Sequence, residues 1–301
     1  MANLRDIRDR IGSVKNTQQI TRAMKMVAAA RLRKAQQSLL AARPYSSRLK
    51  EVIARLMRNT DTRDELLRPR PDPEQVLFIV IASDRGLCGG FNANLFRVIE
   101  NRIERDFREK VKNDNFSMIC IGKKANDHFK KRGYTLHGNY SGFFEDYTYE
   151  KTADIMEWVV DRFKKKKFDA VYLCFNEFMS AISQRRLIEP LLPVAGEFNE
   201  EGPEGSPEDE YKAGIDYIYE PSPEKIIKEL VPLHLNIQLW RSILESHGSE
   251  QGARMAAMDN ATENAGEIIS DLQLKYNQAR QAAITTEISE IVSGAEALGG
   301  D

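Results

Sequence analysis

Apolar residues near the N-terminus recur at alternating steps of three and four. Leu4, Ile7, Ile11 and Val14 begin this series, which has the spacing of a coiled-coil seam. The same register continues through Gln18, Thr21, Lys25, Ala28, Leu32, Ala35, Leu39 and Ala42 and, after a break at Ser46, through Leu49, Ile53 and Leu56. The pattern predicts one long helix over residues 1–58, on the order of 80 Å long. We expect a kink near Pro44 and a partner along the seam.

This seam turns polar at Gln18, Thr21 and Lys25. Across the polar stretch an apolar stripe passes through Ile20, Met24 and Val27. Two interpretations remain open: a local shift of the helix register, or a contact of the polar stretch with another protein.

A second helical pattern occupies residues 223–301 and is free of proline after Pro232. Its apolar positions step by threes and fours through Ala261, Ala265, Ile268, Leu272, Tyr276, Ala279 and Ala283. A further stripe finishes the chain at Ile284, Ile288, Ile291, Ala295 and Leu298. Because small residues allow close helix approach, we expect the two terminal helices to pair antiparallel as a coiled coil.

Strands and helices alternate in the segment between them, residues 74–222. Strands are expected at QVLFIVIA, NFSMICIG, DAVYLCFNEF and SQRRLIEPLLPV, the last two as a hairpin, and IDYIYEP could add one more. Helices are expected over 92–110, at KKANDHFKKRG and over 150–167. The alternation predicts an open α/β sheet. The acidic, glycine- and proline-bearing stretch at 197–213 is expected to be a flexible insertion.

Charge is strongly segregated although the net charge is only −1. Residues 1–58 carry 14 Lys and Arg against 3 acids, or 14 − 3 = +11, and residues 243–301 carry 3 against 10, or −7. Opposite charge at the two ends indicates that they lie together. No apolar run approaches the roughly 18 residues of a membrane span, and the charged N-terminus lacks a signal-peptide core. We therefore expect an intracellular protein, whose three cysteines are reduced and buried.

A glycine-rich loop, SDRGLCGGFN, joins the first strand to the first helix of the central segment. It lacks the lysine and hydroxyl residue of a phosphate-binding P-loop, and its spacing departs from the dinucleotide fingerprint. We therefore interpret the glycines as turn formers that let helix and strand pack closely. Asn92 is expected to cap the helix, and Asp84 to pair with Arg85.

Chemistry-bearing residues are sparse along the chain. The four histidines are scattered without metal-ligand spacing, and no cysteine or serine stands in a nucleophile motif. The sequence therefore predicts no catalytic residue, no metal ligand and no cofactor-binding residue. An alternative is that the chain is an enzyme that uses a nucleotide. This hypothesis requires the isolated chain to bind ATP or NAD. A coiled-coil adaptor or a basic DNA-binding helix would explain residues 1–58 alone, but the acidic C-terminal rod would offset that basic charge against nucleic acid.

Three segments together resemble the gamma subunit of bacterial F-type ATP synthases. They are IRDRIGSVKNTQQITRAMKMVAAARLRKAQ, the loop SDRGLCGGFN, and ESHGSEQGARMAAMDNATENAGEIISDLQLKYNQARQAAITTEISEIVSGAEAL. The resemblance covers effectively the whole chain, in the family's order. It implies an antiparallel coiled coil of the terminal helices carried on a Rossmann-like α/β domain. The acidic insertion lacks the cysteine pair of the chloroplast version, so we do not expect thiol regulation.

The resemblance also implies a function and a set of partners. The family's gamma subunit is a rotor shaft that couples proton- or sodium-driven rotation to ATP synthesis, and it carries no catalytic residues of its own. Its partners are the alpha and beta subunits of the catalytic head, the epsilon subunit and the c-subunit ring. It binds no nucleic acid and meets the membrane only through the complex, at the cytoplasmic face of the bacterial inner membrane.

Seven residues lie in segments that face the beta subunits in this family. Met24 and Lys25 belong to ITRAMK, and Arg254 belongs to EQGARM. The remaining four stand in ARQAAITTE and are Arg280, Gln281, Thr285 and Glu287. The resemblance implies that these residues contact beta subunits and influence coupling.

Overall fold

The computed structural model describes residues 4–58, 64–70, 72–181, 183–194 and 219–298, with the backbone alone at 42, 43, 294 and 296–298. In chain order its elements are α1 (Leu4–Arg58), β1 (Val76–Ile81), α2 (Phe91–Asp106), α3 (Arg108–Lys112), β2 (Phe116–Ile121), α4 (Lys123–Lys131), β3 (Thr135–Leu136), the 3-10 turn η1 (Phe143–Glu145), α5 (Tyr149–Lys164), β4 (Ala170–Phe178), β5 (Gln184–Leu192) and α8 (Pro223–Leu298). The acidic insertion and most of IDYIYEP lie outside the described residues.

The strands form one sheet in the order β3-β2-β1-β4-β5. The first four are mutually parallel, and β5 runs antiparallel to β4, which confirms the predicted hairpin. All six residues of β1 and of β2 are buried. Helices cover both faces of these strands, and this explains why their sequences are continuous apolar runs rather than alternating patterns.

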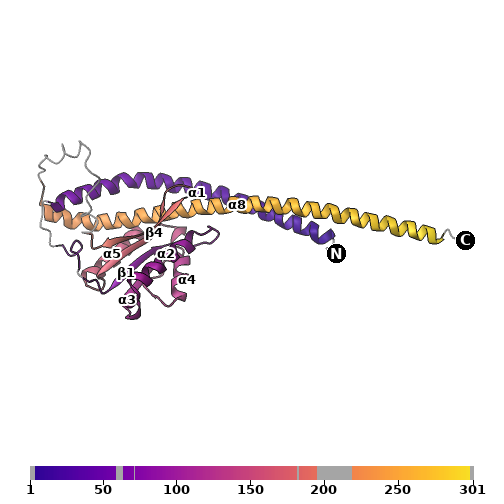
Figure 1. Ribbon diagram of the computed structural model, residues 1–301. Helices are drawn as coiled ribbons and strands as arrows, with labels where there is room; N and C mark the ends of the chain where they lie inside the picture. The colour runs from indigo at the N-terminus through magenta and orange to yellow at the C-terminus, as the bar shows by residue number, and fades with distance from the viewer. Residues whose placement is uncertain (1–3, 59–63, 71, 182, 195–218, 299–301) are drawn as a thin grey trace. The chain divides into compact units, whose positions relative to one another are not determined.

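Helices α2 and α4 cover one face of the sheet, and α5 together with the first part of α8 covers the other (Figure 1). The α2 face is rich in aromatic rings, with Phe78 of β1 at its centre, 5.4 Å from Phe107 and 4.9 Å from Phe116. The α8 side chains buried in the opposite cluster are Ile227, Val231, Leu235, Leu239 and Ile243. Their spacing of four residues places one stripe of α8 on the sheet.

Two elements differ from the sequence predictions. The helix expected over 92–110 is divided into α2 and α3 at Phe107, whose φ of −128° is not helical. Phe107 is buried among the rings around Phe78, so the division places this ring in the core. The pattern also missed the two-residue strand β3, which is too short to show a periodicity.

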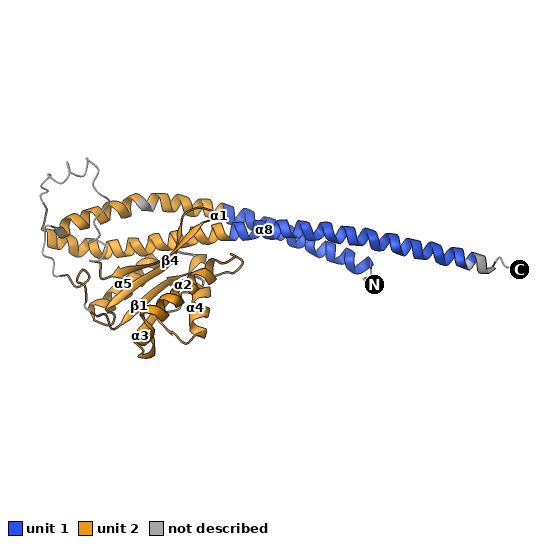
Figure 2. Cartoon of the chain, in the orientation of Figure 1, with its two compact units in different colours: residues 1–29, 254–301 blue, residues 30–253 orange. Residues whose placement is uncertain are grey.

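By internal packing the chain divides into two compact units, residues 1–29 with 254–301 and residues 30–253 (Figure 2). Each unit contains parts of both long helices, and α1 continues through Pro44 without a break. In the larger unit, Leu49 and Ile53 of α1 pack with Ile237 of α8. The Cβ of Ala35 lies 3.8 Å from the position that a Cβ would take on Gly248. Residues later in α1 contact residues earlier in α8, which confirms the antiparallel pairing.

The smaller unit is also antiparallel, since Gln18 and Thr21 meet Thr262, whereas Lys25 meets Asp259. The predicted α1 seam is confirmed, and Thr21 is buried with an exposure of 8%. The alternative of a register shift is wrong. The stripe onto which the seam would have shifted includes Ile20 and Val27, which are 60% and 54% exposed.

Two positions on the predicted α8 stripe are wrong, because Ile268 and Ala283 are both exposed. Ile268 is 46% exposed, and its neighbour Ile269 is buried with an exposure of 8%. Both isoleucines lie three or four residues from Ala265 and from Leu272, which are themselves buried. Heptad spacing is compatible with either isoleucine on the buried stripe. Only the packing of the two helices shows that Ile269 is the buried one.

Candidate functional site

The glycine-rich loop after β1 is built around the carboxylate of Asp84. Oδ1 accepts hydrogen bonds from the backbone N–H of Lys123 at 2.8 Å and of Gly142 at 2.7 Å, and Oδ2 accepts one from Phe144 at 2.9 Å. Arg85 reaches Glu145 at 3.5 Å. The loop therefore holds the start of α4 and the η1 turn in place, a role that the expected Asp84–Arg85 pair did not suggest.

Asn92 does not cap α2 as predicted. The residue before the helix is Gly90, and the cap makes no side-chain hydrogen bond. Asn92 Oδ1 instead accepts from the backbone N–H of Ser83 at 3.1 Å, and Nδ2 donates to the hydroxyl oxygen of Ser83 at 2.7 Å. Asn92 thus fastens the first turn of α2 to the end of β1, which fixes the loop between them.

Glycine is required at two positions around this loop. Gly89 has a φ of +58°, which supports the interpretation of the loop glycines as turn formers. Gly122 follows β2 with a φ of +102°, and a Cβ there would lie 2.1 Å from the carbonyl oxygen of Ala82. The backbones that leave β1 and β2 are therefore closer together than any side chain would allow.

Open α/β sheets bind ligands at a topological switch point, outside the carboxyl ends of the strands where the strand order reverses. In this sheet that point lies between β1 and β4. Helix α8 occupies it: Ser246 Oγ donates to the carbonyl of Ile81 at 3.4 Å, and Ser249 Oγ donates to that of Asn176 at 3.1 Å. We call residues 245–249 of α8 the crevice segment. Polar side chains of the chain itself thus fill this location.

Two aromatic residues near η1 also pack on the crevice segment. The ring of Phe144 stacks on His247 with a centroid distance of 5.4 Å and an interplanar angle of 9°, and Tyr147 lies 5.0 Å from the same imidazole. His247 is buried, as is Glu250 one turn later, 3.7 Å away. Because Asp84 holds the backbone of Phe144, the glycine-rich loop supports this contact indirectly.

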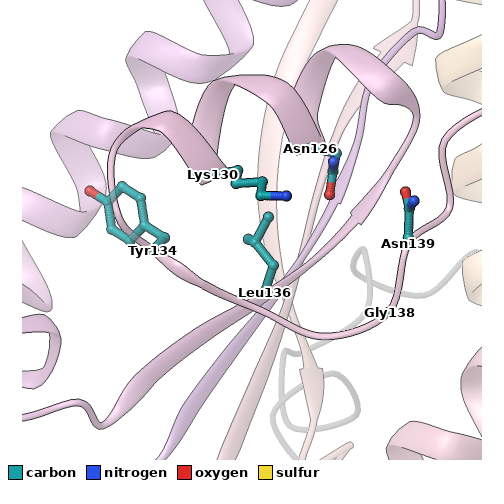
Figure 3. Close-up of a pocket in the computed structure, with 6 residues that line it drawn as sticks. All are labelled: Asn126, Lys130, Tyr134, Leu136, Gly138 and Asn139. Atoms are coloured by element: carbon teal, nitrogen blue, oxygen red, sulfur yellow. The ribbon is translucent and has the colours of Figure 1, made fainter.

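A shallow surface pocket of about 320 Å³ lies beside α4 and β3 (Figure 3). Its lining residues are Asn126, Lys130, Tyr134, Leu136, Gly138 and Asn139. Burial, together with the nearby carboxylates of Glu100 and Glu104, raises the pKa of Tyr134, so its phenol is protonated at neutral pH. The pocket combines two amides, one ammonium group, one phenol and one apolar side chain.

Within the described ranges, no three His, Cys, Asp or Glu side chains converge as a metal site would require. His128 instead forms a structural cluster, with its Nε2 2.8 Å from Glu100, which also pairs with Arg132 at 2.6 Å. None of the helices that the structure describes is both long and apolar enough to cross a membrane.

The polar stretch of the α1 seam contacts α8 in the smaller unit. Thr21 and Thr262 share a hydrogen bond of 2.7 Å between their hydroxyls, and Gln18 Nε2 donates to the carbonyl of Thr262 at 3.3 Å. Lys25 pairs with Asp259. Sequence reasoning missed Asp259 and Thr262 because their importance depends on the register between two helices that are distant in the chain.

The seven residues of the predicted beta-subunit set differ in exposure. Met24 and Lys25 are half-buried, and Arg254 is buried with an exposure of 9%. The side chains of the other four are exposed on the last third of α8, at Arg280, Gln281, Thr285 and Glu287. Figure 1 shows that this part of α8 extends past the N-terminus of α1. The structure thus brings Lys25 into contact with α8 at Asp259, whereas residues 280–287 have no neighbouring helix among the described residues.

Comparison with known proteins gives a match along nearly the whole chain. A family model described as ATP synthase matches residues 3–298. The ATP synthase gamma chain of Chlorobaculum parvum is 49% identical over 99% of both chains, and that of Salinibacter ruber is 46% identical over 99% of both.

Solved structures give the same fold. The rotor of the Euglena gracilis mitochondrial ATP synthase aligns with a TM-score of 0.64 at 20% identity, over 93% of this chain and 98% of that chain. The central stalk of the Tetrahymena thermophila mitochondrial ATP synthase aligns with a TM-score of 0.55 at 23% identity, over 80% of this chain and 99% of that chain. The full-length matches to the bacterial relatives decide the assignment, and this chain belongs to the ATP synthase gamma-chain family.

Proposed function

We propose that this chain is the central rotor shaft of an F-type ATP synthase. It couples ion-driven rotation of the c-subunit ring to the conformational cycle of the catalytic beta subunits, and it carries out no bond chemistry itself. The observation that supports this function is the identity of nearly half the residues to gamma chains along their full length. The proposal places the chain at the cytoplasmic face of the bacterial inner membrane, as a peripheral member of the complex.

The partners follow from the same assignment. The coiled coil enters the head of alpha and beta subunits, and the α/β domain contacts the epsilon subunit and the c ring. The exposed side chains of α8 over residues 280–293 support the first part of this proposal. Ile284, Ile288 and Ile291 are 48%, 55% and 65% exposed. An apolar stripe of this kind at a helix end is consistent with burial in an apolar collar of the head.

A rotating shaft changes a catalytic site only through contacts that differ between angles. Shifting a site from one predominant state to the other takes about 5.5 kcal/mol of differential free energy. A hydrogen bond to a charged group contributes about 1.5–3 kcal/mol. Two to four such contacts around an asymmetric shaft are therefore sufficient to bias one beta subunit.

We assign these contacts to Lys25, Arg254, Gln281 and Thr285, with Met24, Arg280 and Glu287 beside them. Thr285 donates its hydroxyl hydrogen to the carbonyl of Gln281 at 2.9 Å, which leaves the lone pairs of the hydroxyl oxygen available to a beta subunit. Lys25 keeps two further N–H donors besides the one that Asp259 accepts. Both residues can therefore contact a second protein without breaking the bonds seen here.

The test is assembly of the full chain with alpha, beta and epsilon subunits, followed by measurement of ATPase activity and of ATP synthesis in vesicles. We expect co-purification as one complex and synthesis that depends on the ion gradient. ATP or NAD binding by the isolated chain, with no assembly, would instead support an enzyme. Assembly with unrelated coiled-coil proteins only would support an adaptor.

A truncation tests the role of the α8 end. Ending the chain after Thr286 removes Ile288 and Ile291, and we expect reduced torque and reduced ATP synthesis. The matched control ends the chain after Leu298 and removes three residues only. Full torque and coupling in the shorter chain would contradict the role assigned to this stripe.

A further inference from the structure

The crevice segment of α8 is polar where a helix covering a sheet is expected to be apolar. Residues 227–243 cover the sheet with isoleucine, valine and leucine, but Glu245, Ser246 and Ser249 follow them and are buried to exposures of 2%, 1% and 2%. Burial of such groups is unfavourable unless they are hydrogen-bonded. Each of the three has a partner on the sheet, so the polar residues serve a specific contact.

These contacts reach two neighbouring strands. Ser246 donates to the carbonyl of Ile81 at the last residue of β1, and Ser249 donates to that of Asn176 near the end of β4. Glu245 Oε2 accepts from the backbone N–H of Phe178, the last residue of β4, at 3.0 Å. One helical turn of α8 is thus bonded at three points to the carboxyl edge of the sheet, and two of the three use the main chain as acceptor.

Small residues bring the helix close enough for these bonds. Gly248 lies between the two serines, and a Cβ there would lie 3.7 Å from the ring of Phe178. A Cβ on Gly252, one turn later, would lie 2.7 Å from the carbonyl oxygen of Ala181. A larger side chain at Gly252 would therefore push α8 away from the end of the β4–β5 hairpin.

Directional bonds fix the angle of a helix about its own axis, whereas apolar burial is not directional. A rotation of about 20° moves a Cα, which lies about 2.3 Å from the axis, by about 0.8 Å. A shift of this size stretches bonds of 3.0 Å and 3.1 Å beyond hydrogen-bonding range. The three bonds therefore resist rotation of α8 against the sheet much more steeply than the isoleucine and leucine stripe does.

We propose that Glu245, Ser246 and Ser249 form the joint that transmits torque between the α/β domain and helix α8. The inference rests on the proposed rotor function, because only a rotating shaft loads this contact. The crevice segment lies at the switch point of the sheet, where open α/β sheets bind ligands. In this chain that place instead holds α8, which is hydrogen-bonded to the sheet. The three residues position α8 and touch no reacting atoms.

The test uses the complete complex with a bead attached to the α/β domain, so that ATP hydrolysis in the head turns the bead through α8. The variant is Ser246→Ala with Ser249→Ala, which removes two donors and leaves Glu245 in place. The matched control is Ser242→Ala. Ser242 is also a buried serine of α8, but its hydroxyl bonds to the carbonyl of Gln238 in the same helix.

We expect the double variant to hydrolyse ATP and to turn a small bead at the wild-type rate, but to slip or stall with a large bead. ATP synthesis in vesicles is expected to fall several-fold, and Ser242→Ala is expected to behave as wild type in every assay. Wild-type rotation of the large bead by the double variant would overturn the inference. An equal loss at both bead sizes, accompanied by unfolding at lower urea, would also overturn it in favour of a purely structural role.

A different result would show that the proposed rotor function itself is wrong. In that case the wild-type complex would fail to turn either bead, whatever residues stand at 246 and 249. A second variant, Glu245→Gln, keeps an acceptor oxygen for the N–H of Phe178 but removes the charge. We expect it to retain more of the large-bead rotation than Glu245→Ala does, and equal rotation by the two would contradict the hydrogen bond as the cause.

Discussion

Replacing Asp84 by alanine removes the acceptor that organises the glycine-rich loop. Three backbone N–H groups lose their partner, those of Lys123, Gly142 and Phe144. The start of α4 and the η1 turn are then no longer joined to the end of β1. We expect the folded state to persist, because the apolar clusters on both sheet faces are untouched, but with a lower free energy of unfolding.

The magnitude follows from the geometry of the three bonds. A hydrogen bond to a charged group contributes about 1.5–3 kcal/mol. The N–H of Lys123 is at the surface, where water replaces the carboxylate, whereas those of Gly142 and Phe144 are partly buried. The two partly buried bonds decide the effect, and at about 1.5–3 kcal/mol each we expect a loss of about 3–6 kcal/mol in the free energy of unfolding.

Urea unfolding of the full chain, followed by circular dichroism, measures this loss. Asp84→Asn keeps one acceptor oxygen, so its loss is expected to lie between those of wild type and Asp84→Ala. Arg85→Ala is the matched control. Arg85 meets Glu145 in an exposed ion pair, and such pairs contribute about 1 kcal/mol or less. Equal losses for Asp84→Ala and Arg85→Ala would refute the assignment of Asp84 as the organising acceptor.

Three further predictions concern single groups. Gly122→Ala is expected to cost about 2–5 kcal/mol in the free energy of unfolding, because its Cβ would meet a backbone carbonyl. Gly133→Ala, with a φ of +80° but open space, is expected to cost about 1–2 kcal/mol by the same urea assay. Burial is the larger cause of a lowered pKa of His137, and the positive charge of Arg162 lowers it further. The imidazole of His137 therefore takes up a proton at higher pH in the unfolded chain than in the folded chain. Stability is therefore lost as the pH falls through the ordinary value of 6.5, and His137→Phe should show a weaker pH dependence in thermal unfolding below that pH. Burial raises the pKa of Cys120 to about 12 and that of Cys174 well above its ordinary value. Iodoacetamide should therefore label neither thiol in the folded chain and both in urea, as peptide mass spectrometry would show.

Local sequence patterns predicted the main elements of the fold correctly. The strand runs are continuous because β1 and β2 are buried on both faces, so composition alone identifies them. The α1 seam held its register through Thr21 because heptad spacing over many turns outweighs three polar residues. Both signals depend on residues that are near in sequence, and sequence reasoning reads such signals well.

Contacts between distant segments could not be predicted in this way. Asn92 is a residue type that often caps helices and stands at the start of one, yet its side chain bonds to Ser83 because β1 ends beside it. The choice between Ile268 and Ile269 depends on the rotation of α8 against α1. The predicted contacts with beta subunits stay predictions for the same reason, because their partners lie on other chains.

The glycine-rich loop connects several of these observations. Its Asp84 holds the N–H of Phe144, and the Phe144 ring stacks on His247 of the crevice segment. The loop therefore contributes to the position of α8 through Phe144. If Ser246 and Ser249 fix the angle of α8, then Asp84→Ala should weaken the same joint from the opposite side. We expect it to lower the load at which the large bead stalls while small-bead rotation stays at the wild-type rate. Arg85→Ala should leave both rates unchanged, and a stall load for Asp84→Ala equal to that of Arg85→Ala would show that the loop stabilises the fold without supporting the joint.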